Sequence, residues 1–240
     1  MSDDRAVQFG PSAMLSSLLH LEEPDSLVSQ IVLNLALDII EGRARPGQTL
    51  NSLDLAKRFD TSRTPVREAL FALEREGLLE IQARKRPRVM SRSLDQVAEI
   101  YHLRAELHAL LAKEVARRAG PEDLSQIESH LAALKDAVDR GDNNLFFWQN
   151  VAFHDFTTTV ARNLTTKRVL NSLGLQVLRL RHLTMSLPDR MAASYRDHER
   201  LVLAYQEHDV QLAGALSRSL IIGALGALES LSPDDLRGGY

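Results

Sequence analysis

The chain has 240 residues and a formal net charge of −3, with 29 Lys and Arg residues against 32 Asp and Glu, and 44% of its residues are hydrophobic. This length and composition are typical of a globular protein with one large or two small domains. The sequence contains no cysteine, which excludes disulfides and thiolate metal sites and favours a cytoplasmic location. We expect neither a membrane span, because no apolar run approaches about 20 residues, nor a secretory signal.

The charge is distributed unevenly along the chain. Residues 41–92 contain 12 Lys and Arg residues against 7 acidic ones and carry +5, which leaves −8 on the remainder. A basic segment attached to an acidic body indicates a polyanionic partner for one part only. A cluster of charges is also compatible with an ordinary solvated surface, so the charge alone leaves both interpretations open.

The first part of the chain predicts an arm, three helices and a hairpin. Residues 1–24 lack a sustained period and are expected to form a flexible N-terminal arm. Apolar residues recur at helical spacing over 28–39, and shorter helices are expected over about 52–59 and 63–76. Residues 78–90 hold two short apolar segments around a basic tip, which predict a β-hairpin, or wing. This order of elements within residues 25–92 is typical of a winged helix-turn-helix.

The third predicted helix has two different faces. At 100° per residue, its apolar side chains gather on one face, and these are Val66, Ala69, Leu70 and Leu73. Arg63, Thr64 and Arg67 lie on the face that remains, with the two arginines one turn apart. Arginine can make a bidentate contact with guanine in the major groove, where such a helix fits. The pattern therefore predicts a DNA-reading helix.

The remainder of the chain predicts a second, all-α domain, so the fold class is mainly α. Residues 93–230 are expected to form a bundle of six or seven helices for binding an effector and for dimerisation, followed by a C-terminal tail over 231–240. Breaks at Gly, Pro, Asn and Asp residues place six of these helices, at about 94–119, 121–140, 144–162, 166–186, 189–207 and 210–230.

The segment PGQTLNSLDLAKRFDTSRTPVREALFALEREGLLEI, residues 46–81, resembles the DNA-binding domain of the GntR family of bacterial transcription regulators. The helical remainder is similar to the FCD-type ligand-binding domain of the FadR branch. This resemblance implies a cytoplasmic homodimer that binds a palindromic double-stranded DNA operator, acts as a repressor and responds to a small organic acid.

The resemblance also implies which residues contact DNA. Arg63, Thr64 and Arg67 would read bases or nearby phosphates, and Thr61 and Ser62 would anchor phosphate at the start of the helix. The wing would follow the DNA backbone and minor groove through four basic residues, Arg84, Lys85, Arg86 and Arg88. Relatives often carry Gly at the wing tip where this chain has Arg86, so the conformation of the tip is left open.

In the helical domain, the resemblance implies a metal site that is incomplete. Asn150, His154 and His198 match three positions that hold a divalent metal, such as Zn or Ni, in many FCD domains, but the fourth position is Leu220. Leucine cannot ligate a metal, so at most three protein ligands remain. These side chains could instead be hydrogen-bonded polar groups that line a ligand pocket. A replacement ligand such as His108 or His182 cannot be placed from the sequence.

Two further residues are implied to bind the effector together with Asn150, His154 and His198. Arg104 matches an arginine that often faces the pocket, and a buried guanidinium suits a carboxylate. His108 stands where relatives usually have Glu, so the effector is expected to differ from the common organic acids.

Two other functions compete with a ligand-responsive regulator. The first is a metal-dependent enzyme in the helical bundle, but the sequence has no His-Glu-x-x-His helix and no phosphate-binding loop. The second is a DNA-binding protein without ligand control. It is distinguished from the regulator by whether a small acid shifts the melting temperature or releases DNA.

Overall fold

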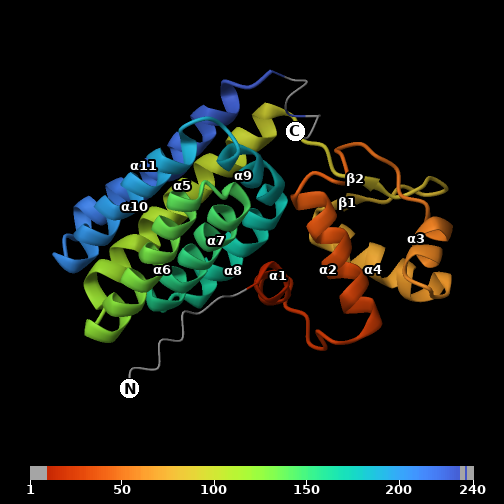
Figure 1. Cartoon of the computed structure of the whole chain (residues 1–240), viewed down its shortest axis with the longest axis horizontal. Helices are drawn as coiled ribbons and strands as arrows, with labels where there is room; N and C mark the ends of the chain where they lie inside the picture. The colour runs from red at the N-terminus through yellow and green to blue at the C-terminus, as the bar shows by residue number, and fades with distance from the viewer. Residues whose placement is uncertain (1–9, 233–235, 237–240) are drawn as a thin grey trace.

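The computed structural model describes residues 10–232 and residue 236. Within these residues the chain is mainly helical and forms a bundle of long helices with a smaller helical unit and a hairpin at one side (Figure 1). The prediction of a winged helix-turn-helix joined to an all-α domain is therefore confirmed.

The smaller unit is the winged helix-turn-helix. Helix α2 packs against α4, α3 also packs against α4, and β1 pairs antiparallel with β2 through Leu79 opposite Val89. The bounds of these elements are α2 Leu27–Ile40, α3 Ser52–Arg58, α4 Arg63–Arg75, β1 Leu79–Glu80 and β2 Arg88–Val89.

Local sequence signals explain how α4 is presented. Ser26 and Asn51 cap α2 and α3, because their side-chain oxygens accept from backbone N–H groups at 3.2 and 3.0 Å. Asp60 adopts a left-handed backbone with φ of 47° and turns the chain between α3 and α4. Val66 and Leu73 are fully buried beneath α4. Packing on one face therefore leaves the opposite face of α4 to solvent.

The larger unit consists of seven helices in the described residues. Helix α11 packs along α5 over most of its length, and α6 packs against α7 and α10. Their bounds are α5 Leu94–Arg118, α6 Pro121–Arg140, α7 Asn143–Val160, α8 Leu164–Gln176, α9 Leu178–Met185, α10 Arg190–Gln206 and α11 Val210–Glu229.

The prediction of one continuous helix over residues 166–186 is wrong. Residues 166–186 were expected to be continuous, but the chain breaks at Val177, whose φ and ψ are −119° and 9°. Helix α8 ends before this residue and α9 begins after it. The break turns α9 toward the winged unit, where it contacts α2.

The prediction that residues 1–24 form a flexible arm is also wrong for part of that segment. Residues 11–18 form helix α1, Pro11–Leu18, whose proline occupies the first turn, where it is tolerated. Met14 and Leu15 are buried, and α1 contacts both α2 and α7 (Figure 1). The apolar face of this short helix therefore joins the core. Residues 1–9 and most of the predicted C-terminal tail lie outside the described residues.

Helix α11 is long and apolar enough to cross a membrane by length and composition, which was not expected from the sequence. Its buried side chains, among them Leu220, Ile221 and Leu225, form a hydrophobic cluster with residues of α5. An apolar helix that packs lengthwise on its neighbours is typical of a bundle core.

Candidate functional site

The predicted DNA-contacting residues of helix and wing lie around one cleft. A cavity of about 480 Å³ separates α4 from the wing and is lined by Arg63 and Arg67 from α4 and by Arg84 and Lys85 from the wing. All four side chains are exposed. Folding thus assembles four cationic side chains from distant parts of the sequence on one open surface, which can attract a polyanion.

The start of α4 offers part of the predicted phosphate site. Ser62 is the N-cap residue, and its side chain makes no capping hydrogen bond, so its exposed hydroxyl remains available to a ligand. The backbone N–H of Thr61 donates to the carbonyl of Ala56 at 2.9 Å, which leaves its hydroxyl for the predicted phosphate contact. Thr64 is exposed in the first turn, where backbone N–H groups have no partner within the helix.

The wing tip turns at a different residue from the one that the sequence singled out. Arg84 adopts a left-handed backbone with φ of 63°, whereas Arg86 has no positive φ. Arg88 lies on β2 and forms an ion pair with Glu80 across the hairpin, at 2.8 Å. Arg84, Lys85 and Arg86 therefore form the basic tip, while Arg88 is partly neutralised on the stem.

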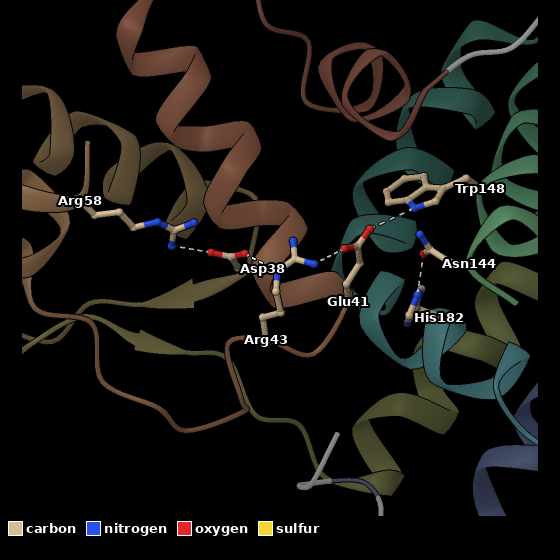
Figure 2. A network of polar contacts seen from close by, with 7 residues as sticks. All are labelled: Asp38, Glu41, Arg43, Arg58, Asn144, Trp148 and His182. Atoms are coloured by element: carbon tan, nitrogen blue, oxygen red, sulfur yellow. Dashed lines mark hydrogen bonds and ion pairs between the residues drawn. The ribbon is translucent and has the colours of Figure 1, made fainter. Parts of the chain in front are cut away.

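A polar network runs from the winged unit to the bundle (Figure 2). The half-exposed Arg43 and Arg58 each bind the buried carboxylate of Asp38 at 2.6 Å, and Arg43 also pairs with Glu41. The other carboxylate oxygen of Glu41 accepts from the indole Nε1 of Trp148 on α7, at 3.4 Å. Trp148 is otherwise buried. The end of α2 is thereby tied to α7 of the bundle.

The five predicted effector residues meet at the centre of the bundle. Arg104 and His108 extend from α5, Asn150 and His154 from α7, and His198 from α10, and all five are buried. The His154 ring centroid lies 4.9 Å from that of His108 and 5.3 Å from that of His198. The sequence prediction that these positions converge is therefore consistent with the geometry.

Hydrogen bonds fix the orientation of His198 and Asn150. The Nδ1 of His198 donates to the carbonyl of Ser194 at 2.7 Å, so its Nε2 accepts from the amide Nδ2 of Asn150 at 3.2 Å. The amide oxygen of Asn150 in turn accepts from Arg181 at 3.3 Å. Arg181, on α9, is a residue of this centre that sequence reasoning missed.

Arg181 and Arg104 place two cations at this centre. The guanidinium of Arg104 lies over the ring of Tyr101, 5.3 Å from its centroid, and its Nε has no hydrogen-bond partner within the described chain. Burial, followed by the charge of Arg104, lowers the pKa of Arg181 to about 9. The acidic residue beside this centre, Asp155, is already paired with Lys167 at 2.8 Å. The cluster therefore has an excess of positive charge.

The three imidazoles at the centre are held in their neutral form. Burial lowers the pKa of His108 and of His154 well below the usual value, and it lowers that of His198 to about 4. Nearby arginines contribute in the same direction. At neutral pH these rings therefore act as hydrogen-bonding groups without charge.

Comparison with known families identifies both units. The family described as "Bacterial regulatory proteins, gntR family" matches residues 27–89, and the FCD domain matches residues 99–222. The chain is a GntR-family regulator with an FCD domain. It is thus a DNA-binding transcriptional regulator and not an enzyme.

The relatives of this GntR-family chain agree with the assignment. It is 29% identical over 182 residues to the HTH-type transcriptional regulator YdhC of Bacillus subtilis, which covers 75% of this chain and 81% of the relative. It is 27% identical over 180 residues to the HTH-type transcriptional repressor RspR of Escherichia coli, covering 75% and 79%. The solved structure of E. coli McbR/YncC shares the fold with a TM-score of 0.74 at 22% identity, covering 85% and 97%.

Some FCD domains bind a divalent metal, but the donors in this chain do not fit one. The oxygen of Asn150 accepts from Arg181, and the Nε2 of His198 accepts from Asn150, so both candidate donors are already used. Leu220 fills the fourth position and is buried. Among the described residues, no three His, Cys, Asp or Glu side chains assemble as a metal would require. The nearby guanidinium groups would also repel a cation.

The space at the centre of the FCD domain is small. A cavity of about 30 Å³ is lined by Arg104, His108, His154 and Arg181, and by Leu18 from α1. This volume suits one or two water molecules rather than an organic acid. The bundle centre therefore offers little free space, and Leu18 of α1 forms part of its wall.

Proposed function

We propose that this regulator is a ligand-responsive repressor that binds a palindromic operator as a homodimer in the cytoplasm. The cleft between α4 and the wing carries the proposal, because it brings Arg63 and Arg67 together with Arg84 and Lys85. Arg63, Thr64 and Arg67 would read base edges in the major groove, and Ser62 would bind phosphate. The wing tip, including Arg86, would follow the DNA backbone.

An exposed apolar stripe on the bundle supports a homodimer. Leu103 and Leu110 lie seven residues apart on α5 and are 49% and 43% exposed. Two-fold pairing through such a stripe would place two copies of α4 on successive half-sites. Introducing glutamate at both positions should convert the dimer to a monomer in sedimentation analysis. A dimer that survives the double change would contradict this interface.

The buried cations support an anionic effector at the bundle centre. Arg104 and Arg181 lie beside neutral imidazoles and lack a carboxylate partner among the described residues. A small carboxylate could bind both guanidinium groups and accept a hydrogen bond from the second amide N–H of Asn150. We propose this metal-free arrangement in place of the Zn or Ni site. The small cavity must widen to admit the acid, since ligand binding selects the state that accommodates it.

Helix α9 offers a route from this centre to the winged unit. Arg181 faces Asn150, whereas its neighbour His182 donates to Asn144 at 3.0 Å beside the Glu41–Trp148 contact (Figure 2). Helix α9 also packs against α2. An acid that draws Arg181 inward would therefore shift α9 against the domain that carries α4.

The decisive experiment selects genomic DNA fragments with the purified protein, with and without a panel of small organic acids. We expect a two-fold symmetric site whose affinity changes in the presence of one acid. Arg104→Gln should keep operator binding but lose the response to that acid. If no acid changes either operator affinity or melting temperature, the protein binds DNA without ligand control.

A further inference from the structure

A further cavity, much larger than the one at the bundle centre, lies between the two domains. It has a volume of about 430 Å³. Its walls include Ile39 of α2 and Leu78 after α4 on one side, and Leu94 of α5 and Leu180 of α9 on the other. Cavities of this size hold metabolite-sized ligands in many proteins. The space is thus sufficient for a ligand that contacts both domains.

Arg92 places one cation in this cavity. It lies in the linker between β2 and α5, and its Nη2 is close to Gly77, where an added Cβ would stand 3.4 Å away. Its buried Nε has no hydrogen-bond partner in the part of the chain that the structure describes. Partial burial lowers the pKa of Arg92.

Arg179 places a second cation there from α9. Its Nη1 donates to the carbonyl of Leu236 at 3.1 Å, but its buried Nε is unpartnered within residues 10–232 and 236. Burial again lowers the pKa of this guanidinium. Neither arginine forms an ion pair within the described residues, and both side chains line the same cavity, so together they offer two cationic groups to an anion.

The remaining lining defines the chemistry of that ligand. None of the described lining residues is acidic, and most are apolar. We propose that this interdomain cavity binds an anionic amphiphile, with its carboxylate on Arg92 and Arg179 and its apolar body against Leu78, Leu94 and Leu180. This site is separate from the bundle centre, where Arg104 and Arg181 lie.

The position of the cavity gives binding a regulatory consequence. A ligand that contacts α2 and the linker as well as α9 stabilises one orientation of the winged domain on the bundle. In a dimer, that orientation determines the separation of the two α4 helices and so the fit to an operator. The ligand should therefore change operator affinity as well as bind.

Isothermal titration calorimetry of the full chain with sodium octanoate tests the site, with 1-octanol as the matched neutral probe. We expect one octanoate per chain and at least about tenfold weaker binding of octanol, because a charged partner strengthens each arginine hydrogen bond. Arg92→Gln and Arg179→Gln should each weaken octanoate binding by about tenfold. Leu180→Trp, which fills the cavity without changing its charge, should also reduce binding.

Two control variants separate this cavity from the exposed surface and from the bundle centre. Arg168→Gln changes an exposed arginine on α8 that does not line the cavity, and it should leave octanoate binding unchanged. Arg104→Gln should also leave it unchanged, since that residue belongs to the bundle centre. The absence of binding, equal affinity for octanol, or loss of binding only in Arg104→Gln would overturn the proposal without affecting the case for DNA binding.

Discussion

The arginines around the cleft between α4 and the wing are exposed to solvent, whereas those of the bundle centre are largely shielded from it. Arg63, Arg67 and Arg84 are exposed around an open cleft, whereas Arg104 is buried and Arg181 is partly enclosed beside three neutral imidazoles. An exposed guanidinium is solvated and can exchange water for DNA phosphate at little cost. A buried guanidinium has lost its water and lacks a carboxylate, so it favours a small anion that enters the protein. The same side chain therefore serves an external polyanion in one domain and an internal anion in the other.

The largest predicted effect is a loss of folding stability at acid pH, which tests whether the imidazoles of the bundle centre are neutral. The pKa of His198 falls from 6.5 to about 4 on folding, so the unfolded chain binds a proton that the folded chain excludes. Stability should be unchanged by this group above pH 6.5 and should fall by about 3 kcal/mol as the pH drops from 6.5 to 4. Urea unfolding at several pH values measures this loss.

A matched pair of variants assigns the pH effect to the buried ring. His198→Gln should make stability less dependent on pH between 6.5 and 4, whereas His102→Gln, at an exposed position of α5, should not. If the stability of His198→Gln depends on pH as strongly as that of the unchanged protein, the buried ring of His198 is not the source of the pH effect.

The second effect tests the reading surface itself. Arg63→Ala or Arg67→Ala should cost about 1–3 kcal/mol of operator binding and weaken base preference, because each removes a bidentate base contact. Gel-shift titration against operator and substituted operators measures both quantities. Arg75→Ala is the control, since Arg75 is exposed on the same helix but does not line the cleft. Equal losses in all three variants would contradict the assignment.

A smaller effect distinguishes the wing from α4. Arg84→Ala or Lys85→Ala should weaken binding to all sequences alike and reduce the dependence of log affinity on log salt by about one unit each. Fluorescence anisotropy over a salt series gives this slope. Arg118→Ala, at an exposed position of α5 and paired with Glu114, should leave the slope unchanged. A selective loss on the operator alone would instead place the wing residues among the base readers.

The smallest predicted signal is the metal content of the purified protein. Protein purified without a histidine tag should contain less than about a tenth of an equivalent of Zn or Ni by elemental analysis, because the donors of Asn150 and His198 are engaged in hydrogen bonds. The unchanged protein could instead contain close to one equivalent of metal, with no further increase in Leu220→His. That result would show that the imidazoles rearrange around a cation. It would then make the bundle centre a metal site rather than an anion site.

The sequence predicted the winged helix-turn-helix well because the signals for its helices and turns are local. The apolar face of α4, the cap Asn51 and the left-handed Asp60 each depend on a few neighbouring residues. The bundle was harder to predict, because the one glycine near the break, Gly174, lies inside α8 and apolar periodicity runs through Val177. Packing of α9 against α2 accompanies that break and cannot be read from the segment alone.

The candidate site of the FCD domain was predicted only in part for a similar reason. Arg104, His108 and His154 could be identified by their positions in the family pattern, whereas Arg181 was not among the positions matched to it. Its place beside Asn150 depends on where α9 lies after the break. Helix α1 did carry a signal, since Pro11 can begin a helix and Met14 and Leu15 share one face, but its short length obscured the period.

The position of α1 also bears on how the molecule assembles. This helix is made early, yet it contacts α7, which a ribosome completes only after the whole winged domain has been made. Leu15 can therefore be buried only after both domains have begun to fold, and a long loop must close to bring α1 into place. The first helix of the chain is thus expected to be among the last to dock, which makes it a sensitive reporter of complete folding.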